Sequence, residues 1–292
     1  MAHRAGFVNI VGNPNVGKST LMNALVGERL SIITSKAQTT RHRIMGIVNG
    51  VDFQIVYSDT PGILEPRYGL QQAMMNFVNK ALADADIILY VTDVNEKPLS
   101  EKEYTSRIRS SGIPVIIAVN KIDLTDQTAL EKITSEWMSA FPGSPVIPIS
   151  ATEGFNLDTL LDSILRRLPE NQPYFPPEQL TDKFERFFVS EILREKILRN
   201  YKEEIPYSVE IEIESFREEP QIIKIGAVIH VARESQKGII IGHRGSMLKK
   251  VGTQARHDLE DFFGKKVFLE LFVKVTKEWR DRPAILKRFG YR

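Results

Sequence analysis

The chain has 292 residues, of which 42% are hydrophobic and 26% are charged. These values are typical of globular proteins and exclude the collagen-like, disordered and coiled-coil classes. The chain has no cysteine, which excludes thiol catalysis, thiolate metal sites and a disulfide scaffold. The first apolar run, Phe7–Val11, is too short for a signal peptide, and no stretch approaches the ~20 apolar residues of a membrane span. We therefore expect a cytoplasmic protein.

The charge is unevenly distributed along the chain. Residues 1–172 carry 16 basic and 18 acidic side chains, and residues 173–220 carry 7 and 12. Residues 221–292 carry 16 basic and 7 acidic side chains, a net charge of +9. A basic C-terminal quarter on an otherwise acidic chain favours an anionic partner, but a solvated basic face explains the same counts. Charge alone leaves both interpretations open.

Short apolar runs alternate with helical patterns over residues 1–168. Near-continuous apolar strands that alternate with helices are typical of a mostly parallel sheet with helices on both faces. We therefore predict an α/β domain over residues 1–168. The expected strands are 7–11, 44–48, 53–57, 87–91, 115–119 and 146–149, and the expected helices follow Lys18 and span 70–83, 101–109, 128–140 and 157–168.

A proline-rich segment follows this domain. Four prolines within residues 169–177 are incompatible with a helix or a central strand, so residues 169–180 are predicted to form a stiff extended linker. The order of patterns then changes, which predicts a separate α+β domain over residues 181–292. Its expected elements are a helix at 184–201, strands at 208–215 and 222–232, a glycine-punctuated helical stretch at 238–263, a strand at 267–275 and a short basic helix near the end.

The segment Gly12–Ser19 matches the pattern G-x-x-x-x-G-K-[ST] and lies between a predicted strand and a predicted helix. In this pattern backbone N–H groups surround the phosphates, the lysine reaches the β- and γ-phosphates, and the serine hydroxyl binds Mg²⁺. A chance match in a chain of this length has odds of roughly one in a hundred, so a glycine-rich turn without a ligand explains it poorly. The expected nucleotide contacts of this loop are Gly12, Asn13, Pro14, Asn15, Val16, Gly17, Lys18, Ser19 and Thr20.

Three weaker patterns follow later predicted strands, and each alone also fits an ordinary turn. In Asp59–Gly62, the carboxylate would join the Mg²⁺ shell and the glycine would sense the γ-phosphate. In Asn120–Asp123, the carboxylate can accept hydrogen bonds from the N1–H and 2-amino groups of guanine, which adenine does not offer. Backbone amides at Ser150 and Ala151 would meet the guanine O6. The expected contacts are Asp59, Thr60, Pro61, Gly62, Ile63, Asn120, Lys121, Ile122, Asp123, Ser150 and Ala151.

In order and at strand ends, these patterns resemble the G1, G3, G4 and G5 motifs of a translation-factor-related GTPase. The segment Ala37–Arg43 then corresponds to switch I. The resemblance implies Thr40, with Thr39 as the alternative, as the Mg²⁺ ligand beside Ser19 and Asp59. The implied chemistry is phosphoryl transfer to water, in which the catalytic residues are Lys18, Thr40 and Gly62.

One familiar catalytic residue is absent from this pattern. Ile63 stands where Ras-type proteins carry a water-orienting glutamine, so we expect slow unassisted turnover. Another side chain, the backbone or a partner must then place the hydrolytic water. Arg41 and Arg43 are candidate charge stabilisers, but the plainer expectation is that both are solvated switch-loop residues.

The sequence Gly242-His243-Arg244-Gly245 lies inside the basic region, between two predicted helical pieces. Such a G-x-x-G loop lets a nucleic-acid backbone approach closely in the KH fold, which clamps about four nucleotides. The predicted order of helix, strand, strand, helix pair and strand is that of a type II KH domain. We expect the aromatics Phe262, Phe263, Phe268 and Phe272 in the core rather than as base-stacking platforms. The expected RNA contacts are Gly242, His243, Arg244, Gly245, Lys249 and Lys250.

A GTPase domain, a proline linker and a type II KH domain together resemble the bacterial Era GTPases over essentially the whole chain. The resemblance includes Lys36–Arg43, Tyr207–Val209 and Arg288–Tyr291, with no departure at a motif position. It implies a GTP-dependent factor, with GTP/GDP and Mg²⁺ as cofactors, in small (30S) ribosomal subunit assembly and rRNA maturation. In that family the KH domain holds the 3′ region of 16S rRNA, and some members associate weakly with the inner membrane. We expect a monomer.

Three other functions fit part of the sequence. A P-loop metabolic kinase would explain Gly12–Ser19 but gives no reason for Asn120–Asp123. An RNA-binding assembly protein with GTP as a structural ligand explains both, and measurable turnover would exclude it. Binding of residues 285–289 to anionic lipid would be weak, because this segment offers few apolar and basic residues.

Overall fold

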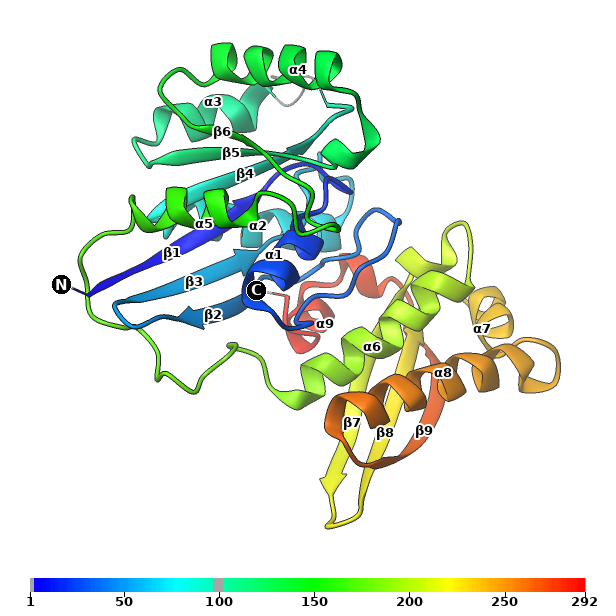
Figure 1. Cartoon of the computed structure of the whole chain (residues 1–292). Helices are drawn as coiled ribbons and strands as arrows, with labels where there is room; N and C mark the ends of the chain where they lie inside the picture. The colour runs from blue at the N-terminus through cyan, green and yellow to red at the C-terminus, as the bar shows by residue number, and fades with distance from the viewer. Residues whose placement is uncertain (1–2, 97–101, 292) are drawn as a thin grey trace. The chain divides into compact units, whose positions relative to one another are not determined.

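The structure is a computed structural model that describes residues 3–96 and 102–291. Within these ranges the chain forms two compact units, both drawn in Figure 1. Unit 1 contains the residues up to Ser31, Thr40–Glu65 and 74–182. Unit 2 contains Ile32–Thr39, Pro66–Ala73 and the residues from Lys183 onward. Of the predicted helix 101–109, residue 101 lies outside the described residues.

Unit 1 is built on a six-stranded sheet with the order β2-β3-β1-β4-β5-β6. All neighbouring strands are parallel except the antiparallel pair β2 and β3, which confirms the mostly parallel sheet. The strands are β1 (Arg4–Val11), β2 (Ile44–Asn49), β3 (Phe53–Asp59), β4 (Ile87–Asp93), β5 (Val115–Asn120) and β6 (Val146–Pro148). The helices are α1 (Lys18–Val26), α2 (Gly69–Ala83), α3 (Lys102–Ser110), α4 (Gln127–Ala140) and α5 (Leu157–Leu165), with a 3₁₀ turn η1 (Ile122–Leu124).

Helices cover both faces of this sheet. Met75 of α2, Ile108 of α3 and Trp137 of α4 pack with Tyr90 and Ile117 in one core cluster. Figure 1 shows α1 and α5 on the opposite face. Every residue of β4 and β5 is buried, which is why these strands read as continuous apolar runs.

Two boundaries of unit 1 differ from the sequence prediction by three residues. Strand β1 begins at Arg4, three residues before the expected start. Helix α5 ends at Leu165 rather than Leu168. Pro169 disfavours helical backbone at the residue before it, and this explains why the helix stops short although Leu168 is itself buried.

The proline-rich segment belongs to unit 1 and hydrogen-bonds along its surface. The Gln54 side chain accepts from the backbone N–H groups of Tyr174 (2.7 Å) and Phe175 (3.0 Å) and donates to the Phe175 carbonyl (2.8 Å). Isolated β-bridges join Glu170 to Arg4 and Thr181 to Gly46. The segment is therefore anchored along unit 1 rather than suspended as a free spacer.

Unit 2 contains a three-stranded sheet with the order β7-β8-β9. Strands β7 and β8 are antiparallel, with a bulge between Ile213 and Ser215, and β8 and β9 are parallel. The order of helix, strand, strand, helix pair and strand confirms the predicted type II KH topology. The elements are α6 (Glu185–Asn200), η2 (Ile205–Tyr207), β7 (Val209–Glu218), β8 (Ile222–Val231), α7 (Glu234–Ile241), η3 (His243–Gly245), α8 (Ser246–Phe263), β9 (Lys266–Val275), η4 (Trp279–Asp281) and α9 (Pro283–Arg288).

The core of unit 2 lies between the sheet and its helices. Leu193 of α6, Ile229 of β8 and Leu259 of α8 are fully buried in one cluster. On the other face of the sheet, the C-terminal segment covers one end, where Phe289 packs on His230 and the Tyr291 hydroxyl donates to Glu210 (2.7 Å). Across the described ranges, no helix combines the length and hydrophobicity that crossing a membrane requires.

The prediction that four C-terminal aromatics lie in the core is wrong for three of them. Phe263 packs against the core cluster. Phe262, Phe268 and Phe272 are 44%, 50% and 58% exposed. Side chains alternate between the two faces of a strand, and the β9 residues that reach the core are Leu269, Leu271 and their odd-numbered neighbours. Phe268 and Phe272 therefore point to the opposite face.

Candidate nucleotide and nucleic-acid sites

Hydrogen bonds join the loops that follow β1, β3, β5 and β6 at the carboxyl edge of the unit 1 sheet. The Asn120 side chain donates to the Val16 carbonyl (2.9 Å) and accepts from the Ala151 N–H (3.0 Å). The Ile63 N–H donates to the Gly12 carbonyl (3.1 Å). The four sequence patterns of this domain therefore lie together, at the edge where ligands bind to open α/β sheets.

Lys18 is the central cation of this edge. Its ammonium group is buried and donates to the carbonyls of Gly12 (3.0 Å) and Asn13 (2.8 Å). Burial lowers the pKa of Lys18 to about 8, although the nearby carboxylates of Asp59 and Glu96 oppose the shift. A buried ammonium that donates its hydrogen bonds to neutral carbonyls is a strong attractor for an anion such as a phosphate.

We expect nucleotide affinity to weaken as the pH rises above about 8. The phosphates of a bound nucleotide stabilise the charged form of Lys18, so binding raises its pKa above the value of about 8 in the free protein. Between these two pKa values binding takes up a proton, and the dissociation constant for GDP should rise about tenfold from pH 7 to pH 9. Calorimetric titrations in buffers of different ionisation enthalpy measure both quantities. A flat pH profile without proton uptake would contradict the assigned role of Lys18.

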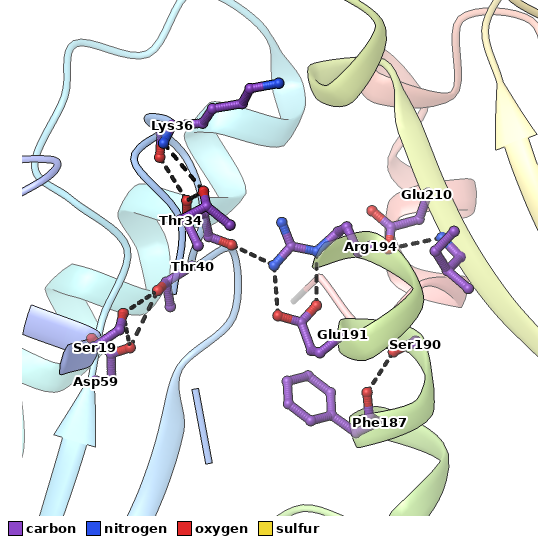
Figure 2. A network of polar contacts seen from close by, with 12 residues as sticks. Ser19, Thr34, Lys36, Thr40, Asp59, Phe187, Ser190, Glu191, Arg194 and Glu210 are labelled. Atoms are coloured by element: carbon purple, nitrogen blue, oxygen red, sulfur yellow. Dashed lines mark hydrogen bonds and ion pairs between the residues drawn. The ribbon is translucent and has the colours of Figure 1, made fainter. Parts of the chain in front are cut away.

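Three oxygen donors converge beside Lys18. The Ser19 hydroxyl donates to Asp59 Oδ2 (2.6 Å) and lies 2.8 Å from the Thr40 hydroxyl, which also donates to Asp59 Oδ2 (3.2 Å) (Figure 2). Asp59 is fully buried, and burial raises its pKa. Two hydroxyls and one carboxylate are hard oxygen ligands, the type that Mg²⁺ prefers, so this donor set fits the ion.

The sequence left open whether Thr39 or Thr40 lies beside Ser19 and Asp59, and the structure places Thr40 there. The Thr39 hydroxyl donates to the Lys36 carbonyl (2.6 Å) and pairs with the Thr34 hydroxyl (2.7 Å). Only Thr40 contributes its hydroxyl to the cluster with Ser19 and Asp59.

The residues after Asp59 pack tightly on the phosphate loop. At Gly62 an added Cβ would lie 2.8 Å from backbone atoms of Pro14, so only glycine fits this approach. The Thr60 hydroxyl donates to the Ile10 carbonyl (2.8 Å), and Pro61 is buried. The Ile63 side chain is 2% exposed and belongs to the core, so it has no access to a hydrolytic water.

The expectation of two solvated arginines is wrong. Arg41 is 1% exposed. Arg43 donates to the Ser58 hydroxyl (2.9 Å) and forms an ion pair with Asp84 (2.5 Å). Both side chains are packed parts of unit 1, and polar partners hold Arg43 away from the role of a charge stabiliser.

The residues expected to read the base lie at the ends of β5 and β6. The Asp123 carboxylate is exposed and accepts from the Ser150 hydroxyl (2.6 Å). Lys121 adopts a left-handed conformation (φ 63°), and its ammonium group donates to the Asn15 carbonyl (2.6 Å) and to Asp93 (2.7 Å). Sequence reasoning missed Asp93, although an acidic residue at the end of the predicted strand, two residues after Val91, was a usable signal.

The G-x-x-G turn of unit 2 lies between α7 and α8. Gly242 has φ 71°, and an added Cβ there would lie 2.7 Å from the Met247 side chain, so this position requires glycine. His243 and Arg244 are exposed at the tip of the turn. Lys249 and Lys250 are exposed on the first turns of α8, which begins after Gly245.

A groove of about 380 Å³ runs from this turn between α8 and β9. Its floor is apolar, with Leu248 on α8 and Leu269 and Leu271 on β9, and Lys249 and Arg256 add positive charge to its α8 side. Sequence reasoning missed Arg256, which follows Lys249 by seven residues and therefore lies on the same helix face. A basic rim over an apolar floor suits a chain that carries phosphates on one side and bases on the other.

Family models match both units. A model described as 50S ribosome-binding GTPase matches residues 7–121, and a KH domain model matches residues 204–280. The GTPase Era of Geotalea daltonii is 44% identical over 289 residues, which cover 98% of this chain and 97% of the relative. The GTPase Era of Staphylococcus haemolyticus is 42% identical over 291 residues, which cover 99% and 97%.

Two solved structures of Era proteins are similar to this chain over its whole length. A crystal structure of Era in complex with MgGDPNP and nucleotides 1506–1542 of 16S ribosomal RNA has a TM-score of 0.95 at 41% identity, with 99% of each chain covered. A crystal structure of an Aquifex aeolicus Era variant bound to GDP·AlF4⁻ has a TM-score of 0.94 at 41% identity, also with 99% of each chain covered. The similarity extends over both units, and the chain belongs to the Era family of GTPases.

Proposed function

We propose that this protein hydrolyses GTP in unit 1 and binds the 3′ region of 16S rRNA in unit 2, as a factor in 30S subunit assembly and rRNA maturation. The observation that carries the proposal is the full-length similarity to an Era that was crystallised with MgGDPNP and nucleotides 1506–1542 of 16S rRNA. The cation of Lys18 and the basic groove beside Gly245 are the two features of this chain that suit those ligands.

In this proposal each residue at the carboxyl edge of the sheet has a separate task. Ser19, Thr40 and Asp59 hold Mg²⁺, which when bound neutralises phosphate charge. Lys18 stabilises the β- and γ-phosphates, and Asp123 accepts the guanine N1–H and 2-amino protons. Asn120 fixes the phosphate loop against the loop after β6. Because Ile63 lies in the core, unassisted hydrolysis is slow and water placement falls to the backbone or to a partner.

We also propose the domain division 1–168, 169–180 and 181–292, and a monomer that works in the cytoplasm. Contact with the inner membrane through the C-terminal segment would be weak. Leu286 is buried and Phe289 packs on His230, so the apolar side chains of this segment already have partners within unit 2. Arg288 forms an ion pair with Glu212 (2.6 Å).

The RNA-binding part of the proposal is tested by replacing both tip residues of the turn, His243→Asp with Arg244→Asp. Two carboxylates at the tip should repel the RNA backbone and reduce binding of the 16S segment 1506–1542 to the level of non-specific association. In the parent protein, about four nucleotides clamped at roughly −0.7 each predict a slope of log affinity against log salt near −2 to −3. Filter binding by the full chain across a salt series measures both effects.

The fold should survive this double substitution. Both side chains are exposed, and aspartate tolerates the left-handed backbone of Arg244 (φ 49°) better than most residues. Lys132→Asp on the exposed surface of α4 is a charge-reversal control and should leave RNA binding unchanged. Undiminished binding by the double variant with a normal melting curve would overturn the placement of RNA at the turn.

A further inference from the structure

Arg194 is a buried cation of unit 2 that neither of the proposed activities uses. Its side chain on α6 is 1% exposed, and its guanidinium donates to both carboxylate oxygens of Glu191 (2.8 and 2.5 Å) and to the Thr39 carbonyl. Figure 2 shows the guanidinium directed at the segment that carries Lys36. That segment belongs to unit 2 and ends directly before Thr40. The buried pair of α6 therefore contacts the part of switch I that leads into the proposed Mg²⁺ site.

Stability alone does not account for the pair of Glu191 and Arg194. Taking two charges out of water costs free energy that their mutual attraction often fails to recover, and two apolar side chains of similar size are commonly at least as stable. Among the described residues, no acceptor faces Nη1 of Arg194, which is buried. A buried N–H group without a partner lowers stability further. The pair therefore indicates a role other than packing.

The segment before Thr40 is held by its own hydrogen bonds and by α6. The Thr39 hydroxyl donates to the Lys36 carbonyl (2.6 Å) and pairs with the Thr34 hydroxyl (2.7 Å), which closes a turn. The Lys36 ammonium group donates to the carbonyl of Tyr201, the residue that follows α6. The helix therefore holds the segment at two points, at residues 194 and 201, about 10 Å apart along its axis.

The bond from Arg194 acts on the peptide group directly before Thr40. The Thr39 carbonyl and the Thr40 nitrogen belong to one planar peptide unit, so a charged donor on this carbonyl fixes the orientation of the whole plane. Thr40 in turn lies 2.8 Å from the Ser19 hydroxyl and donates to Asp59 (3.2 Å). One covalent bond thus joins the residue that Arg194 holds to a residue of the Mg²⁺ donor set.

We propose that Arg194 is a positioning residue for the Mg²⁺ site. By holding the Thr39 carbonyl, it orders the loop in the form in which the Thr40 hydroxyl can bind the ion, and Glu191 orients the guanidinium for this bond. The inference rests on the proposed Mg²⁺ site. Contacts with the γ-phosphate and Mg²⁺ order the switch loops of GTPases, and hydrolysis releases them. The role of Arg194 therefore concerns the triphosphate complex and not the GDP complex.

This role predicts a selective loss of affinity. When only part of the molecules have the loop in its binding form, the apparent dissociation constant rises in inverse proportion to that part. A hydrogen bond from a charged group is strong enough that its removal should reduce the ordered fraction about tenfold. Binding of GDPNP with Mg²⁺ should weaken by the same factor, and binding of GDP should not change.

The test replaces the buried pair with two methionines, Glu191→Met with Arg194→Met. Methionine is similarly long and uncharged, so the full-length variant should melt at the temperature of the parent or above. Its dissociation constant for GDPNP with Mg²⁺ should rise about tenfold or more, whereas that for GDP should stay within about twofold of the parent. Calorimetric titration measures both. Without nucleotide, peptides spanning residues 32–43 should exchange amide hydrogens faster in the variant, which reports the order of the loop directly.

Two further variants show whether the effect belongs to this contact. Arg186→Met makes the same substitution on the same helix, where the exposed Arg186 donates to the Ile213 carbonyl (3.3 Å), and it should change neither affinity. Arg194→Lys keeps a cation beside Glu191 and so protects the fold, but it lacks the planar fork that serves the carboxylate and the carbonyl together. It should therefore also weaken GDPNP binding without changing GDP binding.

Thr40→Val distinguishes the failure of this inference from the failure of the Mg²⁺ site. It removes the proposed ligand itself and should weaken GDPNP binding at least as much as the double methionine variant. Unchanged GDPNP affinity in Thr40→Val would overturn the proposed Mg²⁺ site. If Thr40→Val weakens GDPNP binding but the double methionine variant binds GDPNP like the parent, only the role of Arg194 is refuted. Equal losses of GDPNP and GDP affinity in the double variant would also refute that role, because they would report a general disturbance of the fold.

Discussion

Lys18→Ala is expected to remove nucleotide binding and, with it, GTP hydrolysis. The Lys18 ammonium group is buried at the phosphate loop, where it donates to the Gly12 and Asn13 carbonyls and would face the phosphates. Removing one partner of a buried charge pair costs about 2–5 kcal/mol, which corresponds to a roughly 30- to 4,000-fold loss of affinity. Calorimetric titration with GDP and a phosphate-release assay with GTP measure the two losses.

The Lys18→Ala experiment needs controls that distinguish the loss of the positive charge from a loss of folding. Lys132→Ala, on the exposed surface of α4, removes a lysine from the same unit and should leave both assays unchanged. The Lys18→Ala protein should melt no earlier than the parent in the absence of nucleotide, because burying this ammonium is itself unfavourable, as its lowered pKa indicates. Retention of GDP affinity within a few fold would refute the assignment of Lys18 to the phosphates.

The sequence predicted the fold of both units well because their signals are local. The strands of unit 1 are buried on both faces and read as continuous apolar runs, and Gly12–Ser19 lies between β1 and α1 as its mechanism requires. The α6-β7-β8-α7-α8-β9 order of unit 2 followed from changes of hydrophobic period. In each of these cases the pattern that predicts an element lies within that element and its immediate neighbours.

Long-range packing buries charged side chains in two places that the sequence does not mark. Arg194 is 1% exposed and pairs with Glu191 (2.8 and 2.5 Å) while donating to the Thr39 carbonyl, all within unit 2 (Figure 2). Charged residues three apart on a helix are usually a solvated pair, and only the tertiary fold buries them. Arg41 was misjudged for the same reason.

The exposed phenylalanines of β9 show the opposite error. Phe268 and Phe272 are apolar, so composition assigned them to the core, but the register placed their odd-numbered neighbours there instead. The alternation of lysine, phenylalanine and glutamate along one face of β9 was visible in the sequence. The sequence did not show which face of β9 the helices cover.

Asp123→Asn is expected to exchange the base preference of the protein from guanine to xanthine. In the proposed role the carboxylate accepts hydrogen bonds from the N1–H and 2-amino groups of guanine, whereas an asparagine amide would donate to the 2-carbonyl of xanthine and accept from its N1–H. A site built around such bonds rejects an analogue that lacks them by about 10⁴-fold or more. The Asp123 carboxylate accepts from Ser150, and asparagine retains an acceptor for this hydroxyl, so the loop should keep its shape. Competition titrations with GDP, XDP and ADP give the three affinities.

Asp126→Asn is the matched control, because it makes the same substitution three residues further along the chain. Asp126 caps the N-terminus of α4 by accepting from the Ala129 N–H (2.9 Å), and asparagine is an equally good cap. The Asp126→Asn protein should therefore keep the base preference of the parent protein, with GDP bound far more tightly than XDP or ADP. If Asp123→Asn lost GDP affinity without gaining affinity for XDP, the carboxylate would support the loop rather than read the base. A parent protein that bound ADP as tightly as GDP would overturn the proposed guanine recognition at this site, because adenine presents neither of the two N–H groups that Asp123 is proposed to bind.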